Sequence, residues 1–436
     1  MSYKAFITKV NKVFPIDGAD KIQSAIVLGN QVVVSKEVKV GDLGVFFPAD
    51  CQLSEGFCHH NNLYRDSSKN LDNTKAGFFD SNRRVRCQPF MKVKSEGYFC
   101  GLDSLSYLTS NMDQFKEGQS FDKFLETEIC RKYISEQTQR KLDNQSKNGK
   151  KVKVVETPLF SKHIDTDQFD YYVNKIPAGA LLSFHAKLHG TSARMGYTKV
   201  VKQPSNLWEK LLNRVGMFKS TTWEYVVGTR NVTLYMNDMD KEGFHGTEQF
   251  RFDAMEKVKP YLEKGMTIYA ELSGYANGKP IMGKHDVTKL KDKRYTKKYG
   301  KTIEYSYGCT EDQTRLDIYR ISYTNESGVQ LDYTYPQMKV WCDKYDLNCS
   351  MEVAESYIYS GTPYAKRKLI RQMEELSDRP EVLTEDYYDP SHINEGIILR
   401  VDYDGLIPKF YKKKSYAFKV LEGIFKDTNV DIEDAS

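Results

Sequence analysis

The sequence of 436 residues has few features of a membrane, secreted or disulfide-stabilised protein. It contains no uninterrupted apolar run near the roughly 18 residues that a membrane helix needs, and its first residues include no signal-peptide core. The eight cysteines contain no CxxC pair, so reduced thiols are favoured over a disulfide framework or a zinc site. We therefore expect a cytoplasmic protein that does not enter a membrane.

The composition is that of an ordinary globular protein, because hydrophobic residues make up 40% and charged residues 28% of the chain. At roughly 100 to 200 residues per domain, the length predicts two or three domains. The net charge of +5 is too small for this length to indicate a nucleic-acid partner by itself. Seven basic and only two acidic residues lie between Lys289 and Glu304, so this segment alone carries a charge equal to that of the whole chain.

Residues 1–120 have the pattern of a small β-barrel. Short apolar runs such as 31–35 and 44–47 are separated by turn residues, among them Asp17-Gly18 and Gly41-Asp42. Residues 121–155 become polar and rich in lysine, without a helix or strand period, which predicts a linker.

Residues 156–436 alternate strand and helix patterns, which predicts a second domain of mixed α and β structure. Strand composition is found at 180–188, 267–275, 315–323 and 395–401. Helical spacing is found for Leu207, Trp208, Leu211, Leu212 and Val215. Thr362 followed by Pro363 predicts a helix that begins there and ends near Ser377.

Lys187 ends a strand-like run and is followed by His189 and Gly190, so its amine is expected where the backbone turns sharply. Such a lysine can act as a nucleophile, although a surface lysine before a turn would give the same pattern. Glu271 in YAELSGY and Glu395 at the start of EGIILRV lie beside apolar strand residues. A carboxylate in that position must be paired, hydrogen-bonded or metal-bound, and a structural ion pair is the simpler interpretation of each.

Three consecutive lysines occur in the sequence YKKKS. The strand period of two places Lys412 and Lys414 on one face and Lys413 on the other. Two cations on a single face suit a phosphate ligand, whereas a solvated lysine run is the alternative.

Two further basic segments could contact nucleic acid. In the first, Tyr295 and Tyr299 alternate with basic residues, so their rings could lie against sugars or bases. The basic residues expected to contact phosphates there are Lys293, Arg294, Lys297 and Lys298. A second strip on the barrel consists of Arg83, Arg84, Arg86, Lys92 and Lys94. A solvated loop is the alternative for the first segment.

Six segments resemble, in chain order, the motifs of the covalent nucleotidyltransferases, a superfamily that includes polynucleotide ligases and capping enzymes. The segments are KLHGTS (motif I), GTRN (Ia), YAELSGY (III), DIYRI (IIIa), EGIILR (IV) and YKKKS (V). His189 stands where motif I usually has aspartate, as in several RNA ligases that seal nicks in duplexes. PIDGADKI, VKVGDLGVFFPAD and RRVRCQPFMKVKSEGYF resemble the OB module of the fifth RNA-ligase clade. The resemblance implies an α+β protein in which an N-terminal OB-like β-barrel precedes a mixed α/β nucleotidyltransferase domain, residues 156–436.

The resemblance implies an ATP-dependent RNA ligase. Lys187 would attack the α-phosphate of ATP to form lysyl-AMP, the adenylate would move to an RNA 5′-phosphate, and a 3′-hydroxyl would displace AMP. A free lysine has a pKa of about 10.4, so we expect desolvation and the charges of Lys412 and Lys414 to lower the pKa of Lys187. Lys412 and Lys414 would also stabilise the negative charge of the attacked phosphate.

The resemblance also assigns contacts to the nucleotide and to a metal ion. Glu395 would help to bind Mg²⁺ or Mn²⁺ through oxygen ligands. The nucleotide contacts would be His189 and Gly190 in the loop after the lysine, Arg230 at phosphate or ribose, Glu271 at a ribose hydroxyl, and Tyr319 against adenine with Ile397 or Ile398 opposite. A buried core tyrosine is the alternative for Tyr319, and Arg320 departs from the aspartate of several relatives.

The expected partner is RNA with a 3′-hydroxyl and a 5′-phosphate, in a nicked duplex or an RNA/DNA hybrid, and the protein is expected to act as a monomer. DNA ligases and mRNA guanylyltransferases share the lysyl-nucleotide chemistry, but they generally place an OB module after motif V, where only 22 residues follow Lys414 here. A catalytically inactive RNA-binding relative is a third possibility. The joint presence of five charged motif residues argues against it, because an inactive site has no physical reason to keep them all. These residues are Lys187, Glu271, Glu395, Lys412 and Lys414.

Overall fold

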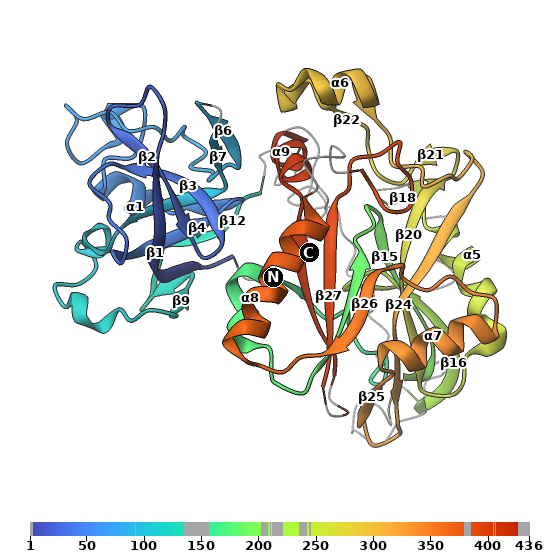
Figure 1. Cartoon of the computed structure of the whole chain (residues 1–436). Helices are drawn as coiled ribbons and strands as arrows, with labels where there is room; N and C mark the ends of the chain where they lie inside the picture. Colours follow the sequence, from blue (N-terminus) through green and yellow to red (C-terminus); the bar gives the residue numbers. More distant parts are fainter. Residues whose placement is uncertain are drawn as a thin grey trace. The chain divides into compact units, whose positions relative to one another are not determined.

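The computed structural model describes residues 3–91, 93–134, 157–201, 208–209, 211, 221–234, 242–243, 246–378, 385–403, 405 and 407–425. The chain divides into two compact units (Figure 1). Unit 1 comprises Met1–Glu136 with Glu422–Thr428, and unit 2 comprises Gln137–Leu421 with Asn429–Ser436. Every helix among the described residues is too short or too polar to cross a membrane.

Unit 1 is a β-structure of short strands, as its sequence pattern predicts. Its six-stranded sheet has the order β3-β2-β1-β4-β8, with β9 beside β1. The strands of this sheet are β1 (Ala5–Pro15), β2 (Ile22–Val27), β3 (Asn30–Ser35), β4 (Leu43–Pro48), β8 (Gly97–Gly101) and β9 (Ser120–Phe121). Shorter elements complete the unit: β5 (Cys51–Leu53), α1 (Glu55–His60), β6 (Gln88–Phe90), β7 (Val93–Ser95), β10 (Lys123–Phe124), β11 (Thr127–Glu128) and β12 (Cys130–Lys132).

The strands of unit 1 enclose a hydrophobic core. Alternate residues of β3 are buried, Val32 and Val34 among them, which is the strand period of two. Phe47 of β4 packs edge-to-face on Phe57 of α1, with ring centroids 5.0 Å apart. The unit therefore has a core of its own that does not depend on unit 2.

The predicted linker begins too early. Strands β9 to β12 extend over residues 120–132, and Phe121 and Phe124 pack against the core of unit 1. These aromatic residues supply the buried surface that a polar linker lacks. Residues 135–155 of the predicted linker lie outside the described part of the chain.

Two large sheets make up most of the described part of unit 2. The first has the order β13-β28-β27-β14-β26 and consists of β13 (Thr166–Gln168), β14 (Leu181–Ala186), β26 (Glu352–Ile358), β27 (Gly396–Asp402) and β28 (Lys409–Lys414). The second has the order β17-β16-β15-β20-β24-β25, with β21 beside β20. Its strands are β15 (Thr191–Val201), β16 (Thr221–Gly228), β17 (Thr233–Leu234), β20 (Met266–Ala276), β21 (Lys279–Pro280), β24 (Thr314–Thr324) and β25 (Gln330–Asp332).

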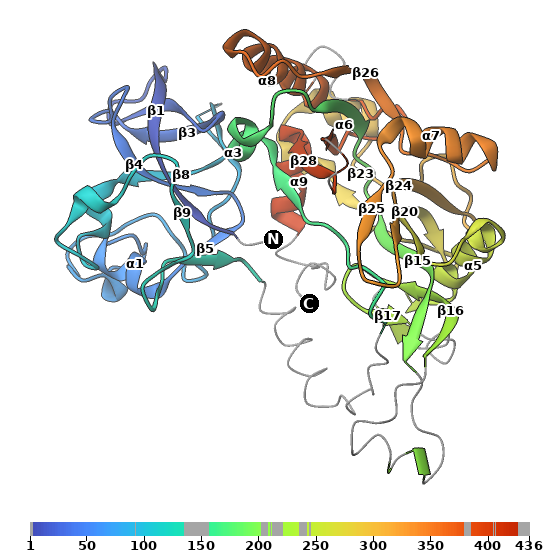
Figure 2. The same ribbon diagram turned by 90° about the horizontal axis from the view of Figure 1, so that it is seen from below.

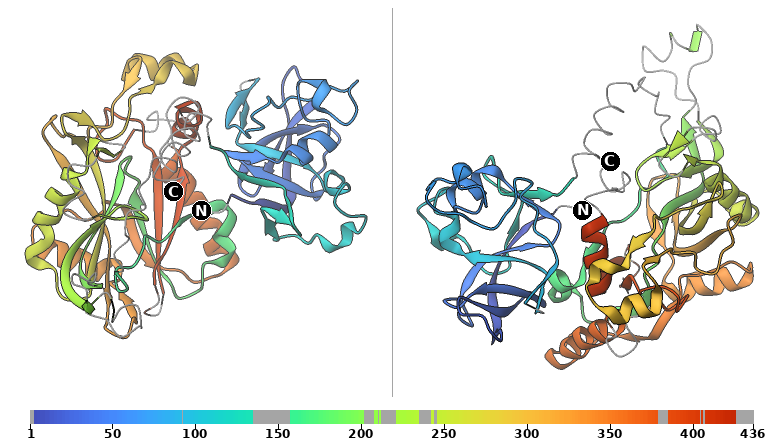
Figure 3. Two further views of the ribbon diagram at one scale, coloured as in Figure 1. Left: turned by 180° about the vertical axis from the view of Figure 1, so that it is seen from behind. Right: turned by 90° about the horizontal axis from the view of Figure 1, so that it is seen from above.

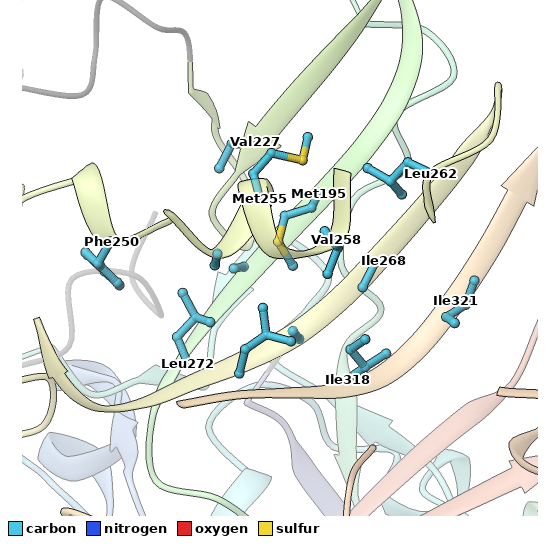
Figure 4. Close-up of a cluster of buried hydrophobic side chains, with 14 of the residues drawn as sticks. Met195, Val227, Phe250, Met255, Val258, Leu262, Ile268, Leu272, Ile318 and Ile321 are labelled. Carbon is cyan, nitrogen blue, oxygen red and sulfur yellow. The ribbon is translucent and has the colours of Figure 1, made fainter. Parts of the chain in front are cut away.

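Helices cover both sheets of unit 2. The helices are α3 (Phe169–Tyr172), α5 (Gln249–Val258), α6 (Lys293–Tyr299), α7 (Tyr335–Lys344), α8 (Pro363–Ser377) and α9 (Tyr416–Phe425). Residues of α5 and α7 share one hydrophobic cluster with β15, β20 and β24, and Figures 2 and 3 show both helices along the seven-stranded sheet. Figure 4 shows the α5 part of this cluster, where Met255 and Val258 lie over Met195 and Ile268.

The predicted helix after Thr362 is confirmed. Helix α8 begins at Pro363 and ends at Ser377, and the hydroxyl of Thr362 accepts a hydrogen bond from the N–H of Ala365 at 3.2 Å. Leu369 and Met373 of α8 are fully buried on the side that packs against the five-stranded sheet. Most of the predicted helical pattern from Leu207 to Val215 lies outside the described residues.

Two further ladders of unit 2 are separate two-stranded sheets. One is formed by β18 (Glu242–Gly243) and β19 (Gly246–Thr247). The other pairs β22 (His285–Asp286) with β23 (Thr302–Ile303) and forms the base of an excursion that carries the 3₁₀ helix η7 (Val287–Leu290) and then α6. Figure 1 shows α6 at the upper end of unit 2, beyond β22.

Candidate active site

Lys187 lies where the chain passes from one sheet of unit 2 to the other. It directly follows β14 of the five-stranded sheet, and β15 of the seven-stranded sheet begins four residues later. The N–H of Lys187 donates to the carbonyl of Gly396 at 2.9 Å, which holds the turn against β27. The side chain is 21% exposed, so its amine is largely withdrawn from water but remains accessible.

Gly190 allows the turn after Lys187 to pass closely over β20. A Cβ atom at this position would lie 2.4 Å from the carbonyl oxygen of Leu272 and 3.0 Å from Cγ of Glu271. Backbone atoms cannot move away from such a contact as a flexible side chain can, so only glycine fits here. The close approach brings the lysine turn beside Glu271.

Two ammonium groups and one imidazole surround the carboxylate of Glu395. Its Oε1 lies 2.9 Å from Nζ of Lys187 and 3.7 Å from Nζ of Lys414, and its Oε2 lies 3.5 Å from Nδ1 of His189. Burial would raise the pKa of Glu395, but Lys187, His189 and Lys414 outweigh it and lower the pKa to about 2. The buried carboxylate is therefore ionised and paired, as its position in the sequence requires.

The lysines of β28 alternate as the strand period predicts. Lys413 forms an ion pair with Asp170 of α3 at 2.6 Å, whereas Lys414 points toward Glu395. Lys412 lies directly opposite Ile398 of β27, on the face that it shares with Lys414. Two of the three ammonium groups thus lie on one side of the strand. This side faces the group formed by Lys187, His189, Glu395 and Lys414, called the Lys187 cluster below.

His189 is held on every side. Its backbone N–H donates to the hydroxyl oxygen of Tyr307 at 2.8 Å, and its ring packs edge-on against Tyr305 and Phe418 with centroids 4.9 and 5.0 Å away. Its Nε2 lies 3.1 Å from Nε2 of His285, so one of the two nitrogens donates to the other. Sequence patterns gave no indication of His285, which lies 96 residues along the chain from its partner.

Glu271 lies across the strand ladder from Ser192, two residues after the lysine turn. The Ser192 hydroxyl donates to its Oε2 at 3.5 Å, and the side chain is half-buried. Arg251 of α5 fixes the start of β15 from the other face, where it donates to the hydroxyl of Thr191 at 2.7 Å. The carboxylate of Glu271 thus borders the same turn as Lys187.

Arg230 and Tyr319 meet at the segment before β13. Arg230 pairs with Asp165 at 2.6 Å, and its carbonyl accepts from the N–H of His163. Nδ1 of His163 lies 2.8 Å from the hydroxyl of Tyr319. Burial and the nearby charge of Arg230 lower the pKa of His163 to about 3, so this histidine is neutral. His163 and Asp165 belong to no motif that the sequence indicated.

Ile397 and Ile398 point to opposite faces of β27. Ile397 is fully buried in the core that α8 covers, whereas Ile398 is half-buried and lies opposite Lys412. Of the two isoleucines, Ile398 therefore lies on the face of the sheet that carries Lys412 and Lys414. The carbonyl of Tyr319 accepts from Arg400 of the same strand at 3.0 Å, which connects β24 to the five-stranded sheet.

Arg320 is part of the interior and not of the nucleotide contacts. It is 1% exposed, forms an ion pair with Asp332 and stacks on Tyr269, with the guanidinium carbon 4.2 Å from the ring centroid. A buried guanidinium needs such a partner, and Asp332 supplies it.

The basic strip of unit 1 is only partly available to a ligand. The side chain of Arg84 is fully buried, pairs with Asp50 at 2.8 Å and lies over the ring of Tyr133. The expectation that Arg84 contacts RNA is therefore wrong for this structure, because its guanidinium is committed to the interior. Arg83 is mostly buried and pairs with Glu55 at 3.1 Å, whereas Arg86 is exposed.

The basic residues of α6 lie on the surface, but its tyrosines do not. Lys293, Arg294, Lys297 and Lys298 are exposed. Arg294 pairs with Asp292 at the N-cap, and Lys298 pairs with Glu385. Tyr295 and Tyr299 pack against the cluster that surrounds His189, so the expectation that their rings lie against sugars or bases is not supported.

Glu395 offers an oxygen ligand to a divalent metal ion. The described residues contain no group of three or more His, Cys, Asp and Glu side chains arranged around a metal position. Oε2 of Glu395 is buried and accepts no hydrogen bond within the described part of the chain, so one oxygen of the required type is present. Mg²⁺ is commonly bound through one or two carboxylates together with phosphate oxygens and water, and this donor set fits that pattern.

Comparison with known proteins assigns the fold of both units. A family model described as an OB-fold domain matches residues 4–97, and no curated protein matches the sequence significantly. Among solved structures, a ligand-free mutant form of the Naegleria gruberi RNA ligase has a TM-score of 0.57 and 16% identity, and the match covers 96% of this chain and 98% of that one. A mutant form with ATP and Mn (TM-score 0.56, 16% identity, 95% and 98% covered) and the ligase with PPi (0.56, 16%, 95% and 97%) are similar.

The chain has an RNA-ligase fold. The predicted architecture, an OB-like barrel followed by a domain of mixed α/β structure, is confirmed. The RNA-ligase fold extends over nearly the whole chain, so the order of the two units agrees with the order expected from the sequence.

Proposed function

We propose that this protein is an ATP-dependent RNA ligase that joins a 3′-hydroxyl to a 5′-phosphate through a lysyl-AMP intermediate. The observation that carries the proposal is the position of Lys187 beside Glu395 and Lys414, at the junction of two sheets with an RNA-ligase fold. A structural ion pair alone would not explain why a partly accessible amine, a buried carboxylate and a second cation converge there.

In the first step, Nζ of Lys187 attacks the α-phosphorus of ATP, the bond to the β-phosphate breaks, pyrophosphate leaves with the bonding electron pair, and the nitrogen releases one proton to the solvent. The amine must be neutral to attack, yet Glu395 lies 2.9 Å away and stabilises its ammonium form. A divalent cation at Glu395 would compensate the carboxylate in place of the ammonium group and so favour the neutral amine, while Glu395 stays beside Lys187. Lys412 and Lys414 then stabilise the charge that develops on the phosphate oxygens.

ATP and a divalent cation are the proposed cofactors. Structures of the similar Naegleria gruberi ligase were obtained with ATP and Mn and with AMP and Mn. Glu395 supplies the oxygen ligand for Mg²⁺ or Mn²⁺, and the metal ion would add positive charge beside the α-phosphate. Glu271 would bind a ribose hydroxyl, Arg230 a phosphate or ribose oxygen, and Tyr319 the adenine ring.

The nucleotide-transfer proposal is tested by incubating the protein with α-labelled ATP and Mg²⁺ and measuring label in the denatured chain. One AMP per chain is expected from ATP, little label is expected from GTP, and Lys187→Ala should remove the label. Lys409→Ala is the matched control, because Lys409 is an exposed lysine of the same strand as Lys412 and Lys414. Absence of label with every divalent cation tried would refute the proposal.

The substrate proposal is a nick in a duplex whose 3′-hydroxyl strand is RNA. The exposed basic residues of α6 are proposed to contact the phosphate backbone, together with Arg86 of unit 1. Replacing Lys293, Arg294, Lys297 and Lys298 by glutamine should raise the KM for the nick and weaken its dependence on salt, with AMP labelling unchanged. Equal sealing of an all-DNA nick would contradict the preference for RNA.

A further inference from the structure

His285 is the most deeply buried histidine beside the Lys187 cluster, and none of the ligase-like motifs includes it. It begins β22 and is 1% exposed. Its Nε2 atom lies 3.1 Å from Nε2 of His189, the residue that stands where motif I usually has aspartate. A direct contact between two buried imidazoles is selective, because one ring must donate while the other accepts.

The contact determines how the ring of His189 is oriented. An imidazole has two nitrogens, and rotating the ring by a half-turn would exchange them. In this structure Nε2 faces His285, so Nδ1 faces Oε2 of Glu395 at 3.5 Å. The rings of Tyr305 and Phe418 restrict the plane of His189, but apolar edges cannot select which nitrogen points where.

His285 is itself firmly placed, as a residue must be if it is to orient another. It pairs with Ile303 in the ladder that closes the α6 excursion. The next residue but one, Val287, is fully buried in the cluster that includes Tyr305 and Phe418. The imidazole itself packs against Tyr305 and Phe418, with ring centroids 5.6 and 5.7 Å away, and these contacts restrict its rotation.

We propose that His285 is a positioning residue, which orients the ring of His189 and thereby holds the carboxylate of Glu395 beside Lys187. This inference rests on the proposed function and deepens it. Glu395 receives its partners from three directions, and His189 is the only one of the three that is a rigid ring and not a flexible ammonium chain. Loss of the His285 contact would leave Glu395 attached only to mobile partners.

The experiment compares two amides that differ by one methylene. His285→Gln places an amide close to the position of the imidazole Nε2, whereas His285→Asn reaches only as far as Nδ1. We expect His285→Asn to slow AMP transfer to Lys187 by about 10- to 100-fold, the range found for groups that orient an active-site ligand, with little change in the KM for ATP. His285→Gln should restore most of the rate.

Thr302→Ala is the matched control for the backbone, because Thr302 is exposed and lies in the partner strand of the ladder. It should label at the wild-type rate. Equal rates for His285→Asn, His285→Gln and the wild type would overturn the proposal. So would equally slow labelling by the two amides, or slow labelling by Thr302→Ala, since packing or the ladder would then account for the effect.

A second measurement separates this inference from the proposed function. The ring-nitrogen NMR signals of ¹⁵N-histidine-labelled protein, assigned with His189→Gln, should shift for His189 in the His285→Asn variant and stay near their wild-type positions in His285→Gln. This readout needs no activity. If the wild type never acquires AMP, the proposed function fails, whereas unchanged His189 signals in both variants would refute the positioning role alone.

Discussion

The charge of Glu395 should make unit 2 sensitive to acid, and the size of the effect follows from the structure. The Lys187, His189 and Lys414 neighbours lower the pKa of this buried carboxylate from 4.5 to about 2. At about 1.4 kcal/mol per pKa unit, the shift corresponds to about 3 kcal/mol of stabilisation. Because the pKa is lower in the folded state, this stabilisation is complete above pH 4.5 and is lost as the pH falls toward 2.

Glu395→Gln isolates this contribution, since glutamine has the shape of glutamate but cannot ionise. We expect the variant to be less stable than the wild type by about 3 kcal/mol at pH 7, and by less than half of that at pH 3. Other carboxylates titrate in both proteins, so they cancel in the difference. The comparison should be made in the presence of a chelator, because a bound metal ion would add its own stabilisation.

Tryptophan fluorescence during urea unfolding is a suitable assay. All three tryptophans, Trp208, Trp223 and Trp341, belong to unit 2, so the signal follows the unit that contains Glu395. The reasoning would be refuted by a difference between the two proteins that stays constant from pH 7 to pH 3. A difference that grows on acidification would likewise contradict it, because the sign of the linkage would be reversed.

Two further predictions concern the same turn and strand. Gly190→Ala should destabilise unit 2 by about 1–3 kcal/mol and slow AMP transfer, because the added Cβ would lie 2.4 Å from a backbone oxygen of β20. Unfolding and labelling experiments on one preparation test both effects. Wild-type values in both experiments would exclude the clash. Lys414→Ala should lower the labelling rate by about 100-fold, whereas Lys413→Ala should lower the stability through its lost pair with Asp170 and leave the rate per folded molecule nearly unchanged. Similar rate losses in the two lysine variants would show that the two faces of the strand are not distinct.

The strand patterns identified the elements of unit 2 that matter for the site. The apolar runs at 267–275 and 395–401 correspond to β20 and β27, and the period of two placed Lys413 and Lys414 on opposite faces of β28. These predictions depend on local periodicity, which a strand expresses wherever it lies in the fold. The order of the motifs then indicated which strands carry the charged residues of the candidate site.

Other features depend on contacts between distant segments, which no local pattern reveals. His285 meets His189 only because the β22–β23 ladder folds back over the lysine turn. Tyr295 and Tyr299 looked like exposed stacking residues in a basic segment, but they supply the apolar face by which α6 packs on the unit. Arg84 looked like a surface cation, but its interior partner Asp50 is 34 residues away.

The turn that carries Lys187 is also the covalent connection from β14 to β15, and it has only four residues between the strands. With so short a connection, a movement of one sheet relative to the other would also move the amine of Lys187. Any opening or closing of the two sheets would therefore be transmitted to an adenylate attached there. The fluorescence of a nucleotide analogue bound covalently to Lys187 would therefore report the relative motion of the two sheets.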